Sequence, residues 1–265
     1  MKVYFAYYPE GKKKALTMSY DDGQIHDRRL VEIFNKYGIK ATFHLNAGIL
    51  DTPGFLTSTE IKDLFQGHEI SAHSLTHPFL TRVPGEVVVH EILEDRKRLE
   101  ALAGYPVRGM SYPFGDYSEE LAKTISYLGI EYSRTVYSHG SFRLPDNFLI
   151  WHPTCHHDDK LLERCREFQK PAPWDQMRLF YVWGHSFEFE RNNNWELIEE
   201  FCKMASDDES VWYATNIEIV DYINALRNLK FSVDRKMVYN PSAIAVWIGV
   251  DGEAVKVEAG EMVTL

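Results

Sequence analysis

The sequence has few cysteines and no excess of positive charge. Its three cysteines, Cys155, Cys165 and Cys202, are odd in number and form no C-x-x-C spacing. A disulfide framework and a four-thiolate zinc site are therefore excluded, and a reducing compartment is favoured. The 265 residues include 29 Lys+Arg and 39 Asp+Glu, a formal net charge of −10. Such a chain lacks the basic face that binds nucleic acid or an anionic membrane, so we expect neither as a partner.

Long apolar runs are also missing. No stretch of about 18 apolar residues occurs, so no transmembrane helix is predicted. Residues 1–10 include Lys2 and Pro9 and contain no apolar segment of the signal-peptide kind. We therefore expect a cytoplasmic protein, although a leader removed from the sequence would give the same pattern. With 45% hydrophobic and 26% charged residues, the composition is that of a globular protein.

Short β-rich runs alternate with helical patterns over most of the chain. Strands are predicted at 15–20, 39–45, 69–72, 110–112, 131–136, 148–154, 178–183 and 211–214. Helices are predicted at 27–37, 59–65, 86–103, 119–128, 160–168, 195–205 and 217–229. This alternation indicates an α/β fold, and the strand number suits a (β/α) barrel better than an open sheet. We expect a barrel of about seven to eight parallel strands over residues 1–234.

The C-terminal segment 235–265 has a different pattern, with alternating β-type runs and no helix. Its turn signals are Asn240-Pro241, Asp251-Gly252 and Gly260. We expect a small antiparallel β-hairpin appendage as a second unit. Its alternating apolar residues, such as Val246 and Ile248, need cover, so it should pack on the outside of the barrel or against a second copy of the chain.

Two adjacent carboxylates, Asp21 and Asp22, end the first predicted strand, and Gly23 follows them. In a barrel of βα units the C-terminal ends of the strands face the mouth, where active sites lie. Neighbouring residues of a strand point to opposite faces, so both carboxylates can serve one site only where the strand has become a turn. Asp-Gly is also a common turn dipeptide, and a purely structural turn is the alternative.

Two histidines four residues apart, His73 and His77, follow a later strand. This spacing would bring both onto one face of a helical turn, where they could share a metal ion. His152 and His156 have the same spacing, so the spacing alone does not identify a metal site.

A further histidine, His185, follows the strand predicted at 178–183, with Glu188 close behind it. A histidine titrates near neutrality, and a carboxylate partner would fix its tautomer, which suits a general acid or base. A structural histidine is the alternative. All three features lie at strand ends of one predicted barrel, and together they supply a metal site, a base and an acid.

The order of these motifs resembles the polysaccharide deacetylases, the NodB-type carbohydrate esterases. The matching segments are Tyr20-Asp21-Asp22-Gly23, His73-Ser74-Leu75-Thr76-His77, Ser111-Tyr112-Pro113-Phe114-Gly115 and Trp183-Gly184-His185. The resemblance extends over about residues 14–190. It implies an irregular (β/α) barrel with one divalent metal ion, commonly zinc, in a surface groove.

The resemblance also implies a role for each matched residue. Asp22, His73 and His77 would bind the metal, leaving positions for a water and the acetyl oxygen. Asp21 would be the general base and His185 the general acid. The implied substrate-binding residues are Tyr112, Pro113, Phe114 and Trp183. The implied activity is removal of acetyl groups from an N-acetylated or O-acetylated saccharide.

One position departs from the family's pattern. Members commonly carry an arginine two residues before the motif proline, where it pairs with the catalytic base, but this chain has Ser111 there. Serine is too short and uncharged to replace a guanidinium. We predict that Arg134, late in the strand at 131–136, reaches Asp21 from a neighbouring position. A solvated surface arginine is the alternative.

Three other interpretations fit parts of the sequence. A metal-dependent hydrolase of a non-sugar amide could use the same barrel and ligands, and the missing motif arginine would allow it. A catalytically silent carbohydrate-binding barrel is the second, although binding needs neither an acid nor a base. The segment 151–159 could form a second metal site through its Cys, His and Asp side chains, but a loop forming a substrate wall is preferred.

Overall fold

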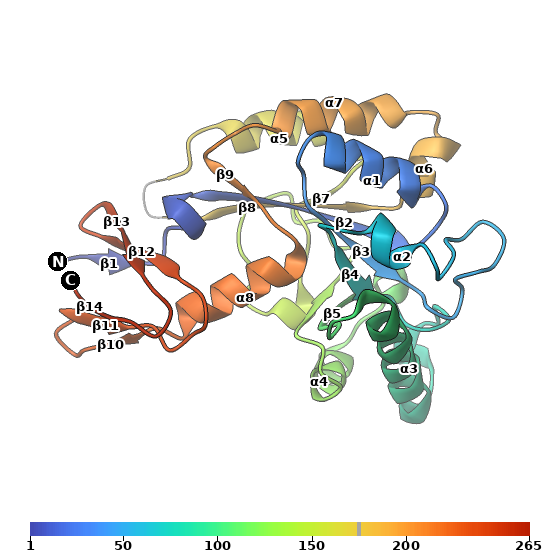
Figure 1. Ribbon diagram of the computed structural model, residues 1–265, viewed down its shortest axis with the longest axis horizontal. Coiled ribbons are helices and arrows are strands. Elements are labelled where there is room, and N and C mark those ends of the chain that lie inside the picture. Colours follow the sequence, from blue (N-terminus) through green and yellow to red (C-terminus); the bar gives the residue numbers. More distant parts are fainter. Residues whose placement is uncertain (174–175) are drawn as a thin grey trace.

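Eight parallel strands form the main sheet of the computed structural model, which describes residues 1–173 and 176–265. They are β2 (Lys14–Asp22), β3 (Ala41–Leu45), β4 (Glu69–Ala72), β5 (Gly109–Ser111), β6 (Tyr132–Arg134), β7 (Cys155–His156), β8 (Arg178–Gly184) and β9 (Val211–Tyr213). Their order is β6-β5-β4-β3-β2-β8-β7, and β9 pairs with the first residues of β2. The predicted α/β barrel of parallel strands is confirmed (Figure 1).

The barrel closes irregularly between β6 and β8. The N–H of Trp151 donates to the carbonyl of Ser133 at 2.9 Å, and the carbonyl of Trp151 accepts from the N–H of Thr135 at 3.0 Å. Three residues later, the N–H of Thr154 donates to the carbonyl of Tyr181 on β8 at 2.8 Å. The segment that follows β6 therefore lies between β6 and β8 and joins them.

The strand predicted at 148–154 is wrong, because the strand of this region is β7 at Cys155–His156. Residues Phe148–Ile150 form a short 3₁₀ helix, and the side chain of Asn147 accepts a hydrogen bond from the N–H of Leu149. This side chain satisfies a backbone donor locally, so the segment does not need a neighbouring strand there. Trp151 forms an isolated bridge with Arg134, and regular pairing with β8 starts at Cys155.

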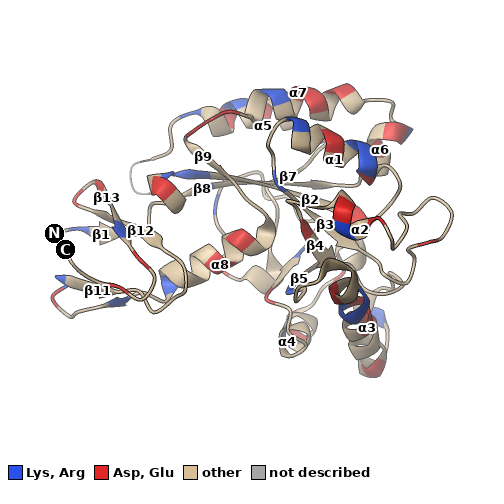
Figure 2. Cartoon of the chain, viewed as in Figure 1, with Lys and Arg blue, Asp and Glu red and all other residues tan. Residues whose placement is uncertain are grey.

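Helices follow most strands and cover the outside of the barrel. They are α1 (Asp27–Lys36), α2 (Ile61–Leu64), α3 (Gly85–Ala103), α4 (Glu119–Tyr127), α5 (Leu161–Gln169), α6 (Ser186–Arg191), α7 (Trp195–Ala205) and α8 (Asn216–Arg227). All except α6 lie where the sequence predicts a helix. Among the described residues, no helix has the length and apolar character needed to cross a membrane. Acidic and basic residues are interspersed on outer helices such as α3 and α7 (Figure 2).

The inner face of the barrel is polar, whereas its outer face packs against the helices. Thr17, Ser19 and Asp21 alternate along β2 and are all buried. The hydroxyl of Ser111 on β5 bonds to Asp21, although β2 and β5 are not neighbours, so these side chains point into the barrel. The intervening residues, Leu16, Met18 and Tyr20, join the apolar core under the helices. This alternation places a carboxylate, Asp21, at the inner edge of the mouth.

The tail forms two small antiparallel sheets beside α8 (Figure 1). One joins β1 (Val3–Tyr4), β12 (Val246–Val250) and β13 (Glu253–Val257), and the other joins β10 (Lys230–Phe231), β11 (Met237–Tyr239) and β14 (Met262–Thr264). β1 and β10 come from outside residues 235–265. Buried Val246 and Ile248 pack with α8, and the N–H of Trp247 donates to the hydroxyl of Tyr222 at 3.0 Å. The tail therefore covers the outside of the barrel, as expected.

Candidate functional site

Asp21 and Asp22 lie at the C-terminal end of β2, where the strand becomes a turn. Asp22 has a φ of 82° and Gly23 a φ of 71°, both in the region that favours glycine. Aspartate enters this region more easily than most residues. Because the backbone turns at Asp22, both carboxylates lie on one side of the mouth. The sequence analysis required such a turn for both to serve one site.

His73 and His77 lie on the loop after β4 and approach Asp22. The Oδ1 atom of Asp22 lies 3.7 Å from Nε2 of His73 and 3.9 Å from Nε2 of His77. Ligand atoms of the three residues lie within 4.8 Å of one another. The helical turn predicted for the two histidines is wrong, because Ser74 and His77 have φ values of 65° and 63°. Both nitrogens nevertheless reach the same carboxylate oxygen.

The hydrogen bonds of His73 leave its Nε2 atom free for a metal. Its Nδ1 lies 3.0 Å from the carbonyl of Ser111, which can only accept, so Nδ1 carries the proton. Burial lowers the pKa of His73, which keeps the ring neutral. One carboxylate oxygen and two imidazole nitrogens within this distance are a ligand set that suits a single zinc ion. The residues present therefore fit the metal that the family resemblance implies.

Asp21 is held by two donors from the neighbouring strands β5 and β6. The hydroxyl of Ser111 donates to its Oδ1 at 3.0 Å, and the guanidinium of Arg134 donates to its Oδ2. Burial alone would raise the pKa of Asp21, but the charge of Arg134 holds it well below its usual range. Arg134 is fully buried, with its guanidinium carbon 4.5 Å from the ring centre of Trp183. The alternative of a solvated surface arginine is therefore wrong.

Ser111 and Arg134 are direct partners in the pairing of β5 with β6. The guanidinium thus comes from the position beside the one where the family commonly has it. Ser111 does not replace the guanidinium, but it helps to hold the base. Its hydroxyl lies between Asp21 and Nδ1 of His73, 2.7 Å from the latter, and links the two predicted functions.

His185 follows β8 and begins α6. Its Nδ1 lies 3.2 Å from Oε2 of Glu188, and its backbone N–H donates to the same oxygen at 3.1 Å. Burial alone would lower the pKa of His185, but the bond to Glu188 and the charges of Asp21 and Asp22 raise it. The sequence analysis missed α6. A carboxylate three residues after the N-cap residue, as Glu188 is after His185, is a known signal for the start of a helix.

A cleft of about 500 Å³ brings most of the predicted residues together. Its lining residues are Asp21, Asp22, His73, His77, Tyr112, Phe114, Gly115, Val136, Trp183 and His185. Pro113 is buried and is not among them, so its contact with a substrate stays a prediction. Arg134 lies behind the cleft, in contact with Asp21. The sequence missed Gly115 and Val136, and a Cβ at position 115 would lie 2.3 Å from Val136, so only glycine fits there.

Phe114 is the most exposed of the predicted substrate-binding residues, with 53% of its surface accessible. Its φ of 59° is unusual for a bulky residue. Its ring centre lies 4.3 Å from that of His77, and it stacks on Phe79 at 3.9 Å. Tyr112 is buried, and its hydroxyl donates to the carbonyl of Leu149. At the rim of the cleft, Phe114 is therefore better placed than Tyr112 to meet a substrate.

Residues 151–159 do not line this cleft, so the substrate wall expected there is not formed. Nε2 of His156 lies 3.0 Å from Oε2 of Glu188, and Nδ1 of His156 accepts from the N–H of Asp158 at 3.2 Å. Both ring nitrogens of His156 are therefore used by protein groups. This segment supports Glu188, and through it His185.

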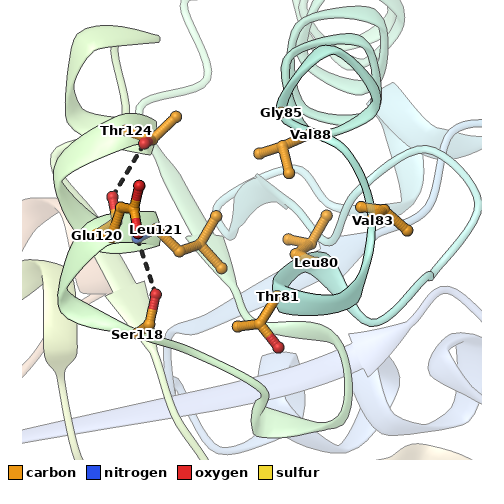
Figure 3. A pocket seen from close by; sticks show the side chains of 9 residues that line it. All are labelled: Leu80, Thr81, Val83, Gly85, Val88, Ser118, Glu120, Leu121 and Thr124. Atoms are coloured by element: carbon orange, nitrogen blue, oxygen red, sulfur yellow. Dashed lines mark hydrogen bonds between the residues drawn. The ribbon is translucent and has the colours of Figure 1, made fainter.

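A second hollow, of about 220 Å³, lies between the first turns of α3 and α4 (Figure 3). Its lining residues are Leu80, Thr81, Val83, Gly85, Val88, Ser118, Glu120, Leu121 and Thr124. None of them is a predicted site residue. This hollow therefore adds no group to the site described above.

Comparisons with known proteins agree with this fold. Residues 9–133 match the family described as Polysaccharide deacetylase. Peptidoglycan-N-acetylglucosamine deacetylase PgdA of Listeria monocytogenes is 27% identical over 129 residues, which are 47% of this chain and 27% of that protein. This chain therefore spans only about a quarter of the length of that relative.

Solved structures show the same fold at low identity. Puue allantoinase superposes with a TM-score of 0.63 and 14% identity, covering 80% of this chain and 91% of that one. A putative polysaccharide deacetylase from Mycobacterium smegmatis gives 0.59 and 16%, covering 83% and 93%. Together with the ordered motifs and the family match, these findings confirm the resemblance seen in the sequence. Over residues 9–133, slightly less than half of its length, the chain is similar to the polysaccharide deacetylase family.

Proposed function

We propose that this chain is a metal-dependent hydrolase that removes acetyl groups from an N-acetylated saccharide. One observation carries the proposal: two adjacent carboxylates have different surroundings in the same cleft. Asp22 faces two histidines, whereas Asp21 is held by Ser111 and a buried arginine. Neighbouring acidic groups with distinct environments are typical of sites in which each has its own chemical task.

Asp22, His73 and His77 are the residues that would hold the metal ion. Zinc suits two imidazole nitrogens and one carboxylate oxygen, and a three-ligand protein set is typical of catalytic sites. When bound, the ion would supply Lewis-acid polarisation of the acetyl carbonyl and a more acidic water. His73 is prepared for this role, since its Nδ1 proton is engaged by Ser111 and its pKa is lowered by burial.

Asp21 is the proposed general base. The charge of Arg134 keeps Asp21 ionised at neutral pH, and the two donors fix its carboxylate in one orientation. Because Asp21 lines the cleft, it can accept a proton from a water that attacks the acetyl carbon. A base held in this way needs no rearrangement before the reaction.

His185 is the proposed general acid. Its raised pKa favours the protonated ring near neutral pH. Its Nδ1 is engaged by Glu188, so the proton on Nε2 is the one available to the leaving amine of the sugar. Base and acid line the same cleft, which lets one accept and the other donate a proton around a single acetyl group.

The relative from Listeria is named for N-acetylglucosamine in peptidoglycan, and this supports an acetylated saccharide as substrate. The rim of the cleft carries Phe114, an exposed aromatic ring against which a sugar face can pack. A second candidate is hydrolysis of a non-sugar amide. The observation that favours it is the shift of the arginine from the position of Ser111 to Arg134, because the base is then held from a different strand.

Acetate release tests the proposal. The substrates are N-acetylglucosamine oligomers, peptidoglycan fragments and small cyclic amides, each with and without chelator. We expect about one zinc per chain, loss of zinc and activity in His73→Ala, and neither loss in the control His90→Ala on the exposed side of α3. Undiminished metal in His73→Ala would contradict the ligand set. Hydrolysis of cyclic amides without acetate release would favour the second candidate.

A further inference from the structure

The loop that carries His73 and His77 has a strained backbone. Ser74 and His77 have φ values of 65° and 63°, in a region that residues other than glycine rarely adopt. Each such residue costs free energy and persists only where surrounding contacts hold it. Something outside the loop must therefore fix the conformation that points both imidazoles at Asp22.

Asp95 on α3 holds the beginning of this loop. It is fully buried, its Oδ2 accepts the backbone N–H of His73 at 3.1 Å, and its Oδ1 accepts the N–H of Ala47 at 2.7 Å. Ala47 lies just after β3 and His73 just after β4. One carboxylate thus ties together two neighbouring strand ends at the mouth, and one of its two contacts is to a predicted metal ligand.

Glu91, one helical turn earlier on α3, holds the middle of the same loop. Its Oε2 accepts the N–H of Thr76 at 2.8 Å, and its Oε1 accepts the hydroxyl of Thr76 at 2.7 Å. Its backbone carbonyl also accepts the N–H of Leu75 at 3.1 Å. Residues four apart on a helix share a face, so Glu91 and Asp95 approach the loop together.

Both carboxylates are buried, and no basic side chain in the described part of the chain forms an ion pair with them. Glu91 is 5% exposed and Asp95 is 0% exposed. In the described part of α3, the acidic partners of the arginine and lysine side chains are Glu94 and Glu100 instead. Burying a carboxylate without a cation is costly, so a purely structural helix would favour apolar residues at these positions. Three of the four carboxylate oxygens accept hydrogen bonds from the loop of residues 73–77, and the fourth accepts one from Ala47.

We propose that Glu91 and Asp95 are positioning residues for the metal ion. They fix the loop of residues 73–77 so that both histidines present Nε2 to Asp22, and this inference rests on the proposed metal site. Each residue meets two donors with two acceptor oxygens. At Asp95 an amide would offer one acceptor and place its NH₂ group against a backbone N–H, so Asn breaks a contact. At Glu91 a Gln could keep both contacts, because the hydroxyl of Thr76 also accepts, so the apolar Leu is the substitution that removes them.

The test compares Asp95→Asn and Glu91→Leu with a control on the same helix, Glu94→Gln. Glu94 lies on the same helix but bonds to Arg98 and Lys97 instead of the loop. Zinc affinity is measured by competition with a chromophoric chelator, and the melting temperature is measured with and without zinc. We expect both loop variants to bind zinc roughly 10- to 100-fold more weakly, as for other residues that orient ligands, with a smaller zinc-induced rise in melting temperature. The control should match the wild type.

Unchanged zinc affinity in both loop variants would overturn the proposal. So would a lower melting temperature of the metal-free variants with an undiminished zinc-induced rise, since that marks a structural role alone. Should Asp95→Asn fail to fold, Glu91→Leu decides, because within residues 1–173 and 176–265 the side chain of Glu91 bonds to Thr76 alone.

The same measurements separate this inference from the proposed function. A wild-type protein that binds zinc tightly but releases no acetate would contradict the function, while the affinity comparison would still support or overturn the positioning role. A wild-type protein that binds no zinc would overturn both.

Discussion

Two Asp-Gly dipeptides in this chain adopt the same backbone region in very different places. At the barrel mouth, φ is 82° at Asp22 and 71° at Gly23, and in the tail it is 49° at Asp251 and 102° at Gly252. Local sequence accounts for both turns equally well, because Asp and Gly tolerate positive φ. The dipeptide alone therefore cannot tell a catalytic turn from a structural one.

The surroundings of the two aspartates make the difference. In the tail, the dipeptide connects β12 to β13, and Oδ1 of Asp251 accepts the N–H of Lys2 at 2.7 Å. At the mouth, Oδ1 of Asp22 faces Nε2 of His73 and of His77. The comparison teaches that the turn is a local property, whereas the site depends on residues that the fold brings from other strands.

The most direct test of this difference makes the same substitution in both turns. Asn also tolerates positive φ, so Asp22→Asn keeps the turn and removes only the carboxylate. We expect it to lose the metal and to lower acetate release by more than about 10²-fold. The matched change Asp251→Asn should leave activity unchanged and shift the free energy of unfolding by less than about 0.5 kcal/mol. Metal content, acetate release and thermal unfolding measure the three quantities, and equal effects in the two turns would refute the distinction.

The second prediction separates the adjacent carboxylates at the mouth. Asp21→Asn and His185→Ala should each keep the metal but lower acetate release by roughly 10² or more, the size of a general base or acid contribution. Metal analysis and single-turnover kinetics check this. Loss of metal in Asp21→Asn would mean that the two aspartates have the opposite roles. Full activity in His185→Ala would remove the proposed acid.

The third prediction concerns the relocated arginine. Arg134→Lys keeps the positive charge but loses the planar guanidinium group with its several N–H donors. Turnover should therefore fall roughly 10-fold or more, which corresponds to the loss of one charge-assisted hydrogen bond. Zinc affinity should change much less, since Arg134 bonds to Asp21 and not to a metal ligand. Ser111→Ala should affect both quantities, because its hydroxyl bonds to Asp21 and to His73. Measuring turnover and chelator competition in both variants tells these effects apart.

The fourth prediction concerns pH. An acid must carry its proton, so activity is present below the pKa of His185 and is lost as the pH rises through it. Glu188 helps to raise this pKa. Glu188→Gln should therefore lower it and move the alkaline loss of activity to lower pH. The pH profile of kcat checks the direction of this change. If the pH at which activity is lost on the alkaline side does not change, another group supplies the proton.

The sequence predicts the fold well because its periodic signals are strong and local. Seven helices and most strands lie within a few residues of their predicted positions. The 3₁₀ helix at Phe148–Ile150 was missed, since a side-chain hydrogen bond there overrides β-type composition. The short helix α6 was missed because six residues give too little periodicity to detect.

The site is predictable only where a motif marks it. The metal-binding candidates and Asp21 follow from the ordered motifs, and Arg134 follows from asking what replaces a missing guanidinium. The contacts of Ser111 and of Asp95 depend on strand register and helix packing over long sequence separations, which no local pattern shows. The cytoplasmic location and the association of copies stay predictions.

The smallest effect on catalysis is expected from the tail. Ile248 is fully buried in the cluster that contains Tyr222 of α8, whereas Ile244 is 39% exposed. Ile248→Ala should cost about 2 to 5 kcal/mol and lower the melting temperature by several degrees, whereas Ile244→Ala should change little. Zinc content and acetate release should be normal in both at a temperature where the protein is folded, because no tail residue lines the cleft. Truncation after Leu229 should reduce stability or solubility further, since it exposes the face of α8 that the tail covers. A truncated protein of normal stability that had lost its metal would show that the tail takes part in the site.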